Sequence, residues 1–107
     1  FKLKEKIIIR YEDMKNKTNE TFYKVLKFLN KINDVKIDKK KMQISIKQTT
    51  FKNLQRLETV DGFEENPSKM PFFRKGEVGE WKNNLDKKQS QKIEKAFDKE
   101  MKELKYL

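Results

Sequence analysis

The pattern of apolar and polar positions predicts one strand near the start of the chain and helices after it. Residues 5–12 contain three consecutive isoleucines, Ile7 to Ile9, with no alternation of apolar and polar side chains. Such a run is typical of a strand buried on both faces of a parallel sheet. One strand cannot form a sheet, and no second strand is evident downstream. We therefore expect this chain to be part of a larger fold.

Two helices are predicted after the strand. Residues 18–31 place apolar side chains at the spacings i, i+3, i+4 and i+7, which predicts an amphipathic helix with Thr18 as its N-cap. A short turn follows, and Asp38 is the predicted N-cap of the second helix. The apolar residues expected to face inward on these helices are Phe22, Val25, Leu26, Leu29, Met42 and Ile46.

The second half of the chain is predicted to be a short helix, a long loop and a last helix. Phe51, Leu54 and Leu57 mark the short helix, and residues 58–80 hold every Gly and Pro of the chain. A loop of this length is usually functional or mobile. Asp86 and Gln89 resemble a capping box that opens the last helix. Its expected apolar stripe is Ile93, Ala96, Phe97, Met101 and Leu104.

Composition limits the classes of site that the chain can hold. The 107 residues are 41% charged and 35% hydrophobic, so any core is lean. The chain has no Cys and no His, which excludes disulfides and thiolate metal sites and removes the commonest general base. No apolar run is long enough for a membrane span, and the first residues do not resemble a signal peptide. We expect no metal site and no membrane partner.

The net charge of +10 indicates an anionic partner. The excess is almost entirely Lys, and the lysines are interleaved with Asp and Glu along the whole chain. Nucleic-acid recognition usually recruits Arg, of which there are only three. The charge pattern therefore favours a solvated surface over a nucleic-acid face. A small basic helical module that binds nucleic acid or another polyanion without catalysis remains the alternative.

The long loop contains a candidate phosphate site. Arg74 and Lys75 precede Gly76, and Gly79 and the only tryptophan, Trp81, follow within six residues. Glycine lets the backbone approach an anion, and successive N–H groups in such a turn form a concave anion site. Arg supplies a planar fork for phosphate oxygens, and Lys supplies a point charge. These residues predict a phosphate-binding loop.

The same letters resemble a known family. Arg74-Lys75-Gly76, followed by Gly79-Glu80-Trp81-Lys82, resembles the C-terminal signature of cytosolic-type sulfotransferases that use 3′-phosphoadenosine 5′-phosphosulfate (PAPS). Further matches lie in collinear order at Tyr11–Met14, Lys27–Leu29 and Thr49–Phe51. The resemblance covers essentially the whole chain. It implies an α/β class, as the C-terminal part of a P-loop-like three-layer fold that is mostly helical with one buried parallel strand at about 5–12.

The resemblance also implies an activity and a donor site. The family transfers a sulfonate group from PAPS to a hydroxyl or amine, with 3′-phosphoadenosine 5′-phosphate (PAP) as the product. The implied donor contacts are Tyr11, Thr49 and Phe51 around the adenine, and Arg74, Lys75 and Gly76 on the 3′-phosphate. The alternatives from the residues themselves are a half-buried core Tyr11, a core anchor at Phe51 and an exposed basic turn at 74–76. Trp81 is expected to be a packing anchor under the loop.

Some features of the family are absent from residues 1–107. The family's 5′-phosphosulfate loop and catalytic His precede the region that matches, so we expect no catalytic residue here and no activity from this chain alone. A degenerate protein that keeps the fold for interaction only is a further alternative.

The family's dimer motif is degraded at Asp86, Lys87 and Gln91, and the short segment after Phe51 leaves the acceptor unidentified. The absence of targeting signals and the resemblance together predict a cytoplasmic protein.

Overall fold

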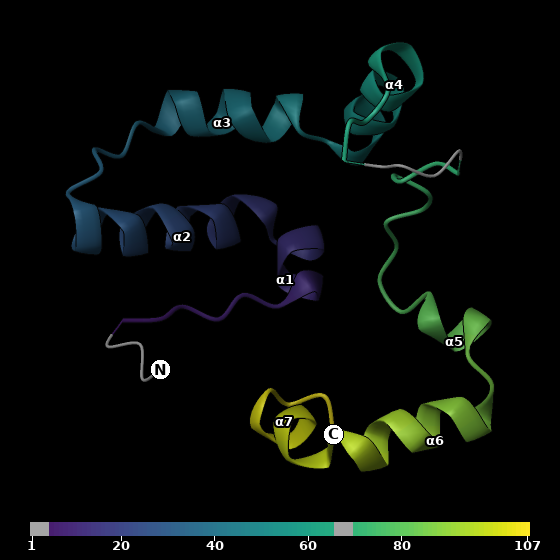
Figure 1. Cartoon of the computed structure of the whole chain (residues 1–107). Coiled ribbons are helices and arrows are strands. Elements are labelled where there is room, and N and C mark those ends of the chain that lie inside the picture. Colours follow the sequence, from purple (N-terminus) through teal and green to yellow (C-terminus); the bar gives the residue numbers. More distant parts are fainter. Residues whose placement is uncertain (1–4, 66–69) are drawn as a thin grey trace.

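The described part of the chain is helical. The computed structural model describes residues 5–65 and 70–107. Its helices follow one another around an open arc rather than in stacked layers (Figure 1). They are α1 (Tyr11–Asn16), α2 (Thr18–Asn33), α3 (Lys39–Gln48), α4 (Phe51–Asp61), α5 (Trp81–Asn84), α6 (Lys87–Ala96) and α7 (Asp98–Glu103).

The predicted strand at 5–12 is wrong for the described residues. Residues 5–10 belong to no strand, and helix α1 begins at Tyr11. The backbone of Arg10 is extended, with φ −83° and ψ 141°, but an extended segment becomes a strand only by pairing with another. No partner strand is present in 5–65 or 70–107. The first turn of α1 contains Glu12 and Asp13, whose charges favour a helix N-terminus.

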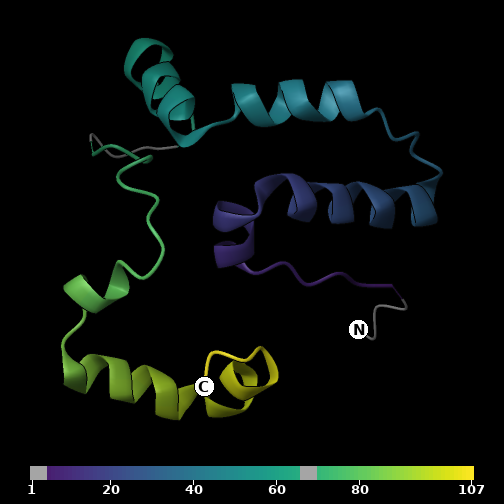
Figure 2. The same ribbon diagram turned by 180° about the vertical axis from the view of Figure 1, so that it is seen from behind.

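Helices α1, α2 and α3 form the best-packed region. Helices α2 and α3 run antiparallel and lie side by side in both views (Figures 1 and 2). Met42 on α3 is 7% exposed and Thr21 on α2 is 4% exposed, and they are the only buried side chains among the described residues. The Thr21 hydroxyl donates to the carbonyl oxygen of Asp13 at 3.0 Å, which fixes α1 against α2. The inward orientation predicted for Met42 is confirmed.

Two of the three predicted N-caps are confirmed. The Asp38 carboxylate accepts a hydrogen bond from the Lys41 N–H, and Asp86 and Gln89 form a complete capping box. Thr18, however, is the first residue inside α2, and Lys17 is the N-cap. The Thr18 hydroxyl donates to the Met14 carbonyl at 2.7 Å, because α1 ends at Asn16, two positions earlier. Thr18 thus joins two helices instead of capping one.

The predicted last helix is divided at Phe97. Helix α6 ends at Ala96 and α7 begins at Asp98, with Phe97 at φ −119° and ψ 26° between them. The C-terminal residues after α7 return to the start of α1. There the Arg10 guanidinium carbon lies 4.4 Å from the centroid of the Tyr106 ring.

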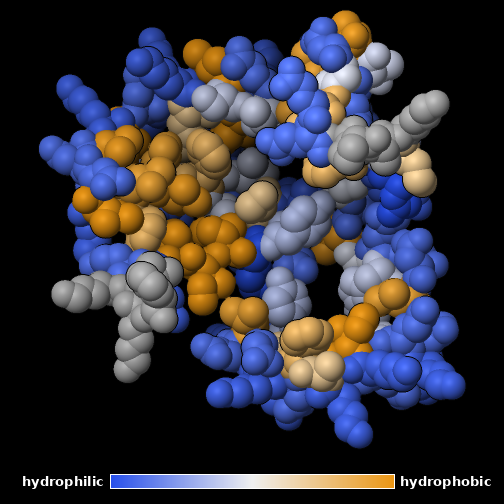
Figure 3. All heavy atoms as spheres, in the orientation of Figure 1, coloured by the Kyte–Doolittle hydropathy of each residue, from blue (hydrophilic) through white to orange (hydrophobic). Residues whose placement is uncertain are grey.

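The described residues bury little apolar surface among themselves. The radius of gyration is 17.3 Å, whereas a compact domain of this length has about 13 Å. Figure 3 shows apolar side chains gathered on the visible face over the N-terminal elements. Large apolar residues such as Ile8 and Phe97 remain more than half exposed. No helix in the described ranges is both long enough and apolar enough to cross a membrane.

Candidate functional site

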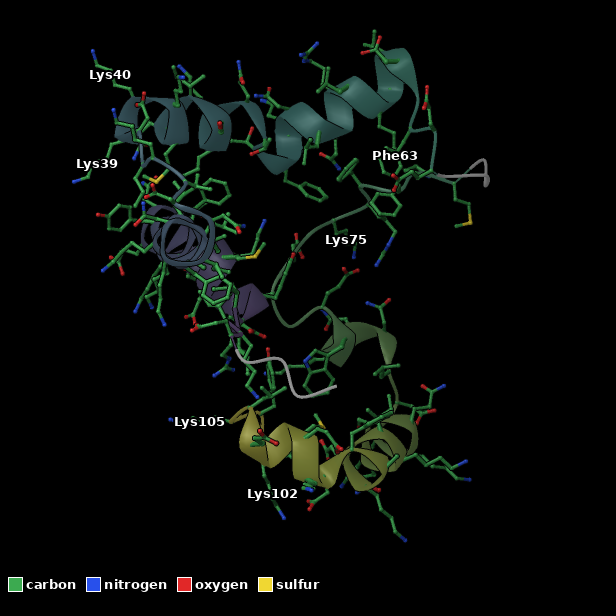
Figure 4. All side chains as sticks on the ribbon, turned by 60° about the vertical axis from the view of Figure 1, so that its left-hand side comes forward. Lys39, Lys40, Phe63, Lys75, Lys102 and Lys105 are labelled. Atoms are coloured by element: carbon green, nitrogen blue, oxygen red, sulfur yellow. The ribbon has the colours of Figure 1, made fainter. Side chains whose placement is uncertain are left out.

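Helix α4 fixes the backbone of the loop that follows it. The Glu58 carboxylate accepts hydrogen bonds from the N–H groups of Phe72 at 2.6 Å and Phe73 at 3.0 Å. The Gln55 side-chain amide donates to the carbonyl oxygens of Phe73 at 2.8 Å and Arg74 at 3.2 Å. Gln55 and Glu58 are three residues apart and therefore project from the same side of the helix. Their contacts hold 72–74 beside α4, and Figure 4 shows Lys75 on this loop.

Phe51 and Gly76 are in direct contact. A Cβ atom at position 76 would overlap the ring of Phe51, and Gly76 has φ +63°, a conformation that other residues rarely adopt. Glycine is therefore required here by the backbone and by the close approach. The Phe51 ring also packs edge-on against Phe73, with 6.1 Å between ring centroids. The half-buried Phe51 thus connects the first turn of α4 to the loop.

Arg74 and Lys75 converge on one carboxylate oxygen. Oε1 of Glu80 lies 2.6 Å from Nη2 of Arg74 and 3.3 Å from Nζ of Lys75. The side chain of Glu80 is 14% exposed, whereas those of Arg74 and Lys75 are 54% and 49% exposed. Asn84 supports Glu80 from α5: its amide donates to the Glu80 carbonyl at 2.8 Å and to Oε1 at 3.3 Å.

The charge state of Glu80 follows from these contacts. Burial acts to raise the pKa of the Glu80 carboxyl, but the hydrogen bonds and charges of Arg74 and Lys75 outweigh it. The pKa of Glu80 therefore lies below its ordinary value, and the carboxylate is ionised at neutral pH. Two cations thus meet one anion, a group with a net charge of +1. Gly79 lies at φ +78°, and this turn directs Glu80 back toward the two cations.

The structure brings together four of the six residues predicted to contact the sulfonate donor. Arg74, Lys75 and Gly76 form the loop, and Phe51 packs against it. Thr49 is exposed two residues before Phe51, and its hydroxyl donates to the Ser45 carbonyl at 2.8 Å.

Tyr11 is less closely connected to the site. It is exposed as the first residue of α1, not at the end of a strand. Within the described ranges, no hydrogen bond or ring contact joins Tyr11 to the loop. Another α1 residue, Lys15, reaches Phe51: its ammonium nitrogen lies 5.3 Å from the centroid of the Phe51 ring.

The predicted packing role of Trp81 is wrong for the described residues. The Trp81 side chain is 51% exposed at the start of α5. Its ring contacts the ammonium group of Lys82, with 5.8 Å from Nζ to the ring centroid. A large aromatic side chain becomes an anchor only when other elements cover it, and the described residues leave half of the Trp81 side chain exposed.

Three residues of the site were not singled out from the sequence: Gln55, Glu58 and Glu80. Their only sequence signals are the i, i+3 spacing of the first two on a predicted helix and the acidic position before Trp81. A shallow pocket of about 400 Å³ lies between α4 and the loop, with Gln55 and Thr59 on one side and Pro71 and Arg74 on the other. Within the described ranges, no group of three His, Cys, Asp or Glu side chains is arranged to hold a metal ion.

Comparison with known proteins decides the family. The sequence model of the Sulfotransferase domain family matches residues 1–105. The chain belongs to the sulfotransferase domain family. The sulfotransferase signature predicted at 74–82 therefore lies inside a region that the family model covers. No solved structure matches the chain significantly.

Curated sulfotransferases match nearly the whole chain. Sulfotransferase 1E1 of Bos taurus is 31% identical over 102 residues, which are 90% of this chain and 33% of that protein. Amine sulfotransferase of Oryctolagus cuniculus is 28% identical over 106 residues, 91% of this chain and 33% of the relative. Sulfotransferase 2A1 of Macaca fascicularis is 29% identical over 105 residues, 92% and 34% respectively. The chain thus spans about a third of the length of these relatives.

Proposed function

We propose that this chain supplies the adenosine and 3′-phosphate side of the donor site in a PAPS-dependent sulfotransferase. The enzyme transfers a sulfonate group from PAPS to a hydroxyl or amine acceptor and releases PAP. The observation that carries the proposal is the convergence of Arg74 and Lys75 on one oxyanion beside the Phe51–Gly76 contact. An anion-binding pair and an aromatic ring therefore lie within one short region, as a phosphorylated nucleoside requires.

The N–H donors of Arg74 and Lys75 suit the binding of a phosphate group. In its contact with Glu80, Arg74 uses one of its two terminal nitrogens, and a guanidinium has five N–H donors. Both cations are about half exposed, so a phosphate can reach them from solvent. A charge-assisted hydrogen bond to such a group is worth about 1.5–3 kcal/mol, less where solvent screens it. Arg74 and Lys75 therefore bind the 3′-phosphate in this proposal, and Gly76 lets the backbone approach it.

The adenine contacts are proposed from Phe51, Thr49 and Tyr11. Phe51 offers a ring for stacking, although its contacts with Gly76 and Phe73 also make it a structural anchor of the loop. Thr49 is exposed beside it and retains acceptor capacity on its hydroxyl oxygen. Tyr11 offers a phenol from the neighbouring helix α1. These residues would fix the nucleotide so that its sulfonate faces the acceptor in line.

The complete enzyme requires more than residues 1–107. We propose that they form the C-terminal portion of the family's three-layer, P-loop-like domain. The 5′-phosphosulfate loop and the catalytic base would come from the preceding portion, since residues 1–107 contain no His. The chain alone is then inactive. Loss of the family dimer contact at Asp86, Lys87 and Gln91 and a cytoplasmic location stay predictions.

The alternative function is binding of nucleic acid or another polyanion without catalysis. The net charge of +10 favours it, and Figure 4 shows Lys39, Lys40, Lys102 and Lys105 pointing away from the ribbon. Such a module would bind anions with a strong dependence on salt and no preference for a 3′-phosphate. Lysines distributed over several helices give no single contact geometry. Polyanion binding therefore has less support than the donor-site function, which rests on the Arg74–Lys75 pair.

The two functions are distinguished by thermal shift with PAP and adenosine 5′-monophosphate (AMP) at matched salt. At 100 times its dissociation constant a ligand stabilises the folded state by about 2.7 kcal/mol, which a melting curve resolves. We expect stabilisation by PAP well above that by AMP, and loss of the difference in Arg74→Ala. Lys88→Ala also removes one positive charge, from an exposed position on α6, and serves as the control. An equal response to both nucleotides, or an unchanged response in Arg74→Ala, would contradict the proposal.

A further inference from the structure

Glu80 has an unusual place among the charged residues of the loop. Its carboxylate is largely buried, while the two cations that it binds are half exposed. Asn84 holds it from the other side through both its carbonyl and Oε1. The acid is therefore the fixed member of the group, and the long, flexible side chains of Arg74 and Lys75 are directed by it.

The same contact leaves both cations able to bind a second anion. Arg74 meets Glu80 through Nη2, which leaves its remaining N–H donors for other partners, and Lys75 has three donors on its ammonium group. Without a fixed partner, each of these side chains has considerable rotamer freedom, which binding must then remove. A largely buried carboxylate that fixes both in advance reduces that loss.

We propose that Glu80 is a positioning residue for the 3′-phosphate, which acts by holding Arg74 and Lys75 convergent before the nucleotide arrives. The inference rests on the proposed donor-site function, and it goes further by giving the acidic position of the loop a role in selecting the 3′-phosphate. Glu80 touches neither the sulfonate nor the acceptor in this account. Its effect reaches the nucleotide only through the two cations.

Charge and positioning predict opposite effects of removing the carboxylate. PAP carries one phosphate more than AMP, so loss of a nearby negative charge alone strengthens PAP binding more than AMP binding. The PAP/AMP affinity ratio would then rise in Glu80→Gln. Loss of positioning weakens only the contacts to the 3′-phosphate, so the ratio would fall. The sign of the change therefore separates the two effects.

The test measures dissociation constants of PAP and AMP by calorimetry on the full chain, with circular dichroism to verify the helical content of each variant. We expect Glu80→Gln to lower the ratio of PAP affinity to AMP affinity about tenfold, which corresponds to about 1.4 kcal/mol. Glu80→Asp keeps the charge but is one methylene shorter, so it cannot keep both contacts, and we expect the ratio to fall here as well. The matched control is Glu77→Gln, which removes a charge from an exposed position of the same loop and leaves the ratio unchanged or slightly higher.

The outcomes separate this inference from the function on which it rests. A wild-type ratio near one overturns both. A wild-type preference for PAP together with an unchanged or higher ratio in Glu80→Gln and Glu80→Asp overturns the positioning role and leaves the donor site standing. A lower ratio in both Glu80 variants, with Glu77→Gln like the wild type, supports positioning.

Discussion

The hydroxyl of Tyr106 donates a hydrogen bond to the carboxylate of Glu12 at 3.0 Å, across 94 positions of the sequence. Arg10 lies against both partners, over the Tyr106 ring at 4.4 Å and 3.7 Å from Glu12. This contact joins the residues after α7 to the first turn of α1, which contains Tyr11 of the candidate site. The C-terminal end of the chain therefore helps to place α1.

Removing the Tyr106 hydroxyl should loosen that connection without unfolding the helices. In Tyr106→Phe the ring can still pack under Arg10, but Glu12 loses a donor. We expect a small decrease in melting temperature, unchanged helical content, and faster hydrogen exchange in residues 98–107. Tyr23→Phe is the control, because it removes a hydroxyl from α2, where the ring lies near the ammonium groups of Lys27 and Lys39. Exchange rates in 98–107 that match the wild type would show that the hydroxyl does not hold this end.

The same contact predicts a pH dependence. A hydrogen bond from the Glu12 backbone lowers the pKa of its carboxyl; burial opposes this, and Tyr106 and Arg10 lower the pKa further. A carboxyl whose pKa is lower in the folded state stabilises that state above its unfolded pKa, and the contribution is lost as the pH falls through the folded value. The stability difference between wild type and Tyr106→Phe should thus be constant near neutral pH and decrease as the pH falls from the ordinary value of 4.5 through the lower folded value. Melting curves from pH 7 to pH 3 measure it, and a difference that grows on acidification would contradict the assignment.

Gly76 and Gly79 offer a matched pair of substitutions. Both have positive φ, so alanine is strained at either position by about 1–2 kcal/mol. At Gly76 the new Cβ would also overlap the Phe51 ring, whereas at Gly79 it would meet nothing within 4 Å. We expect Gly76→Ala to be the more destabilising and to abolish PAP binding. Equal melting temperatures for the two variants would mean that the Phe51–Gly76 contact is not maintained in solution.

Glu58 should control the order of the loop. Its carboxylate accepts from two backbone N–H groups, at Phe72 and Phe73, which in Glu58→Ala would have only water as a partner. We expect faster proteolytic cleavage within 70–80 and weaker PAP binding at nearly unchanged helical content. Glu64→Ala removes an exposed acid just after α4 and is the control. If both variants are cleaved at the wild-type rate, helix α4 does not anchor the loop.

The sequence predicted correctly those elements that depend on contacts between residues close together in the chain. The starts of α3 and α6 were predicted because Asp38 and Asp86 complete their own N-terminal hydrogen bonds. A turn was predicted at Gly76; the structure shows φ +63° there and adds the contact with Phe51. Features that depend on distant partners were missed or wrong. The run at 7–9 forms no strand because pairing needs a second strand, and Trp81 is not covered by the described residues.

The contacts of Glu80 with Arg74 and Lys75 also could not be predicted from the sequence. The motif places an acid after Gly79, but the positive φ of Gly79 and the ion pairs of Glu80 with Arg74 and Lys75 are seen only in the structure. A sequence pattern gives the order of these residues and not the direction of their side chains. The same holds for Gln55 and Glu58, whose partners are backbone groups about 14–19 positions away.

The central claim is that Arg74, Lys75 and Gly76 bind the 3′-phosphate of an adenine nucleotide next to Phe51. The most direct measurement is a titration of the isotope-labelled chain with PAP and with AMP, followed by the backbone amide resonances. We predict that PAP shifts the amides of 74–76 and of Phe51 and that AMP leaves those of 74–76 largely unchanged. Equal shifts with both nucleotides, spread over the lysine-rich helices α2, α3 and α6, would contradict the claim and favour a general polyanion-binding module.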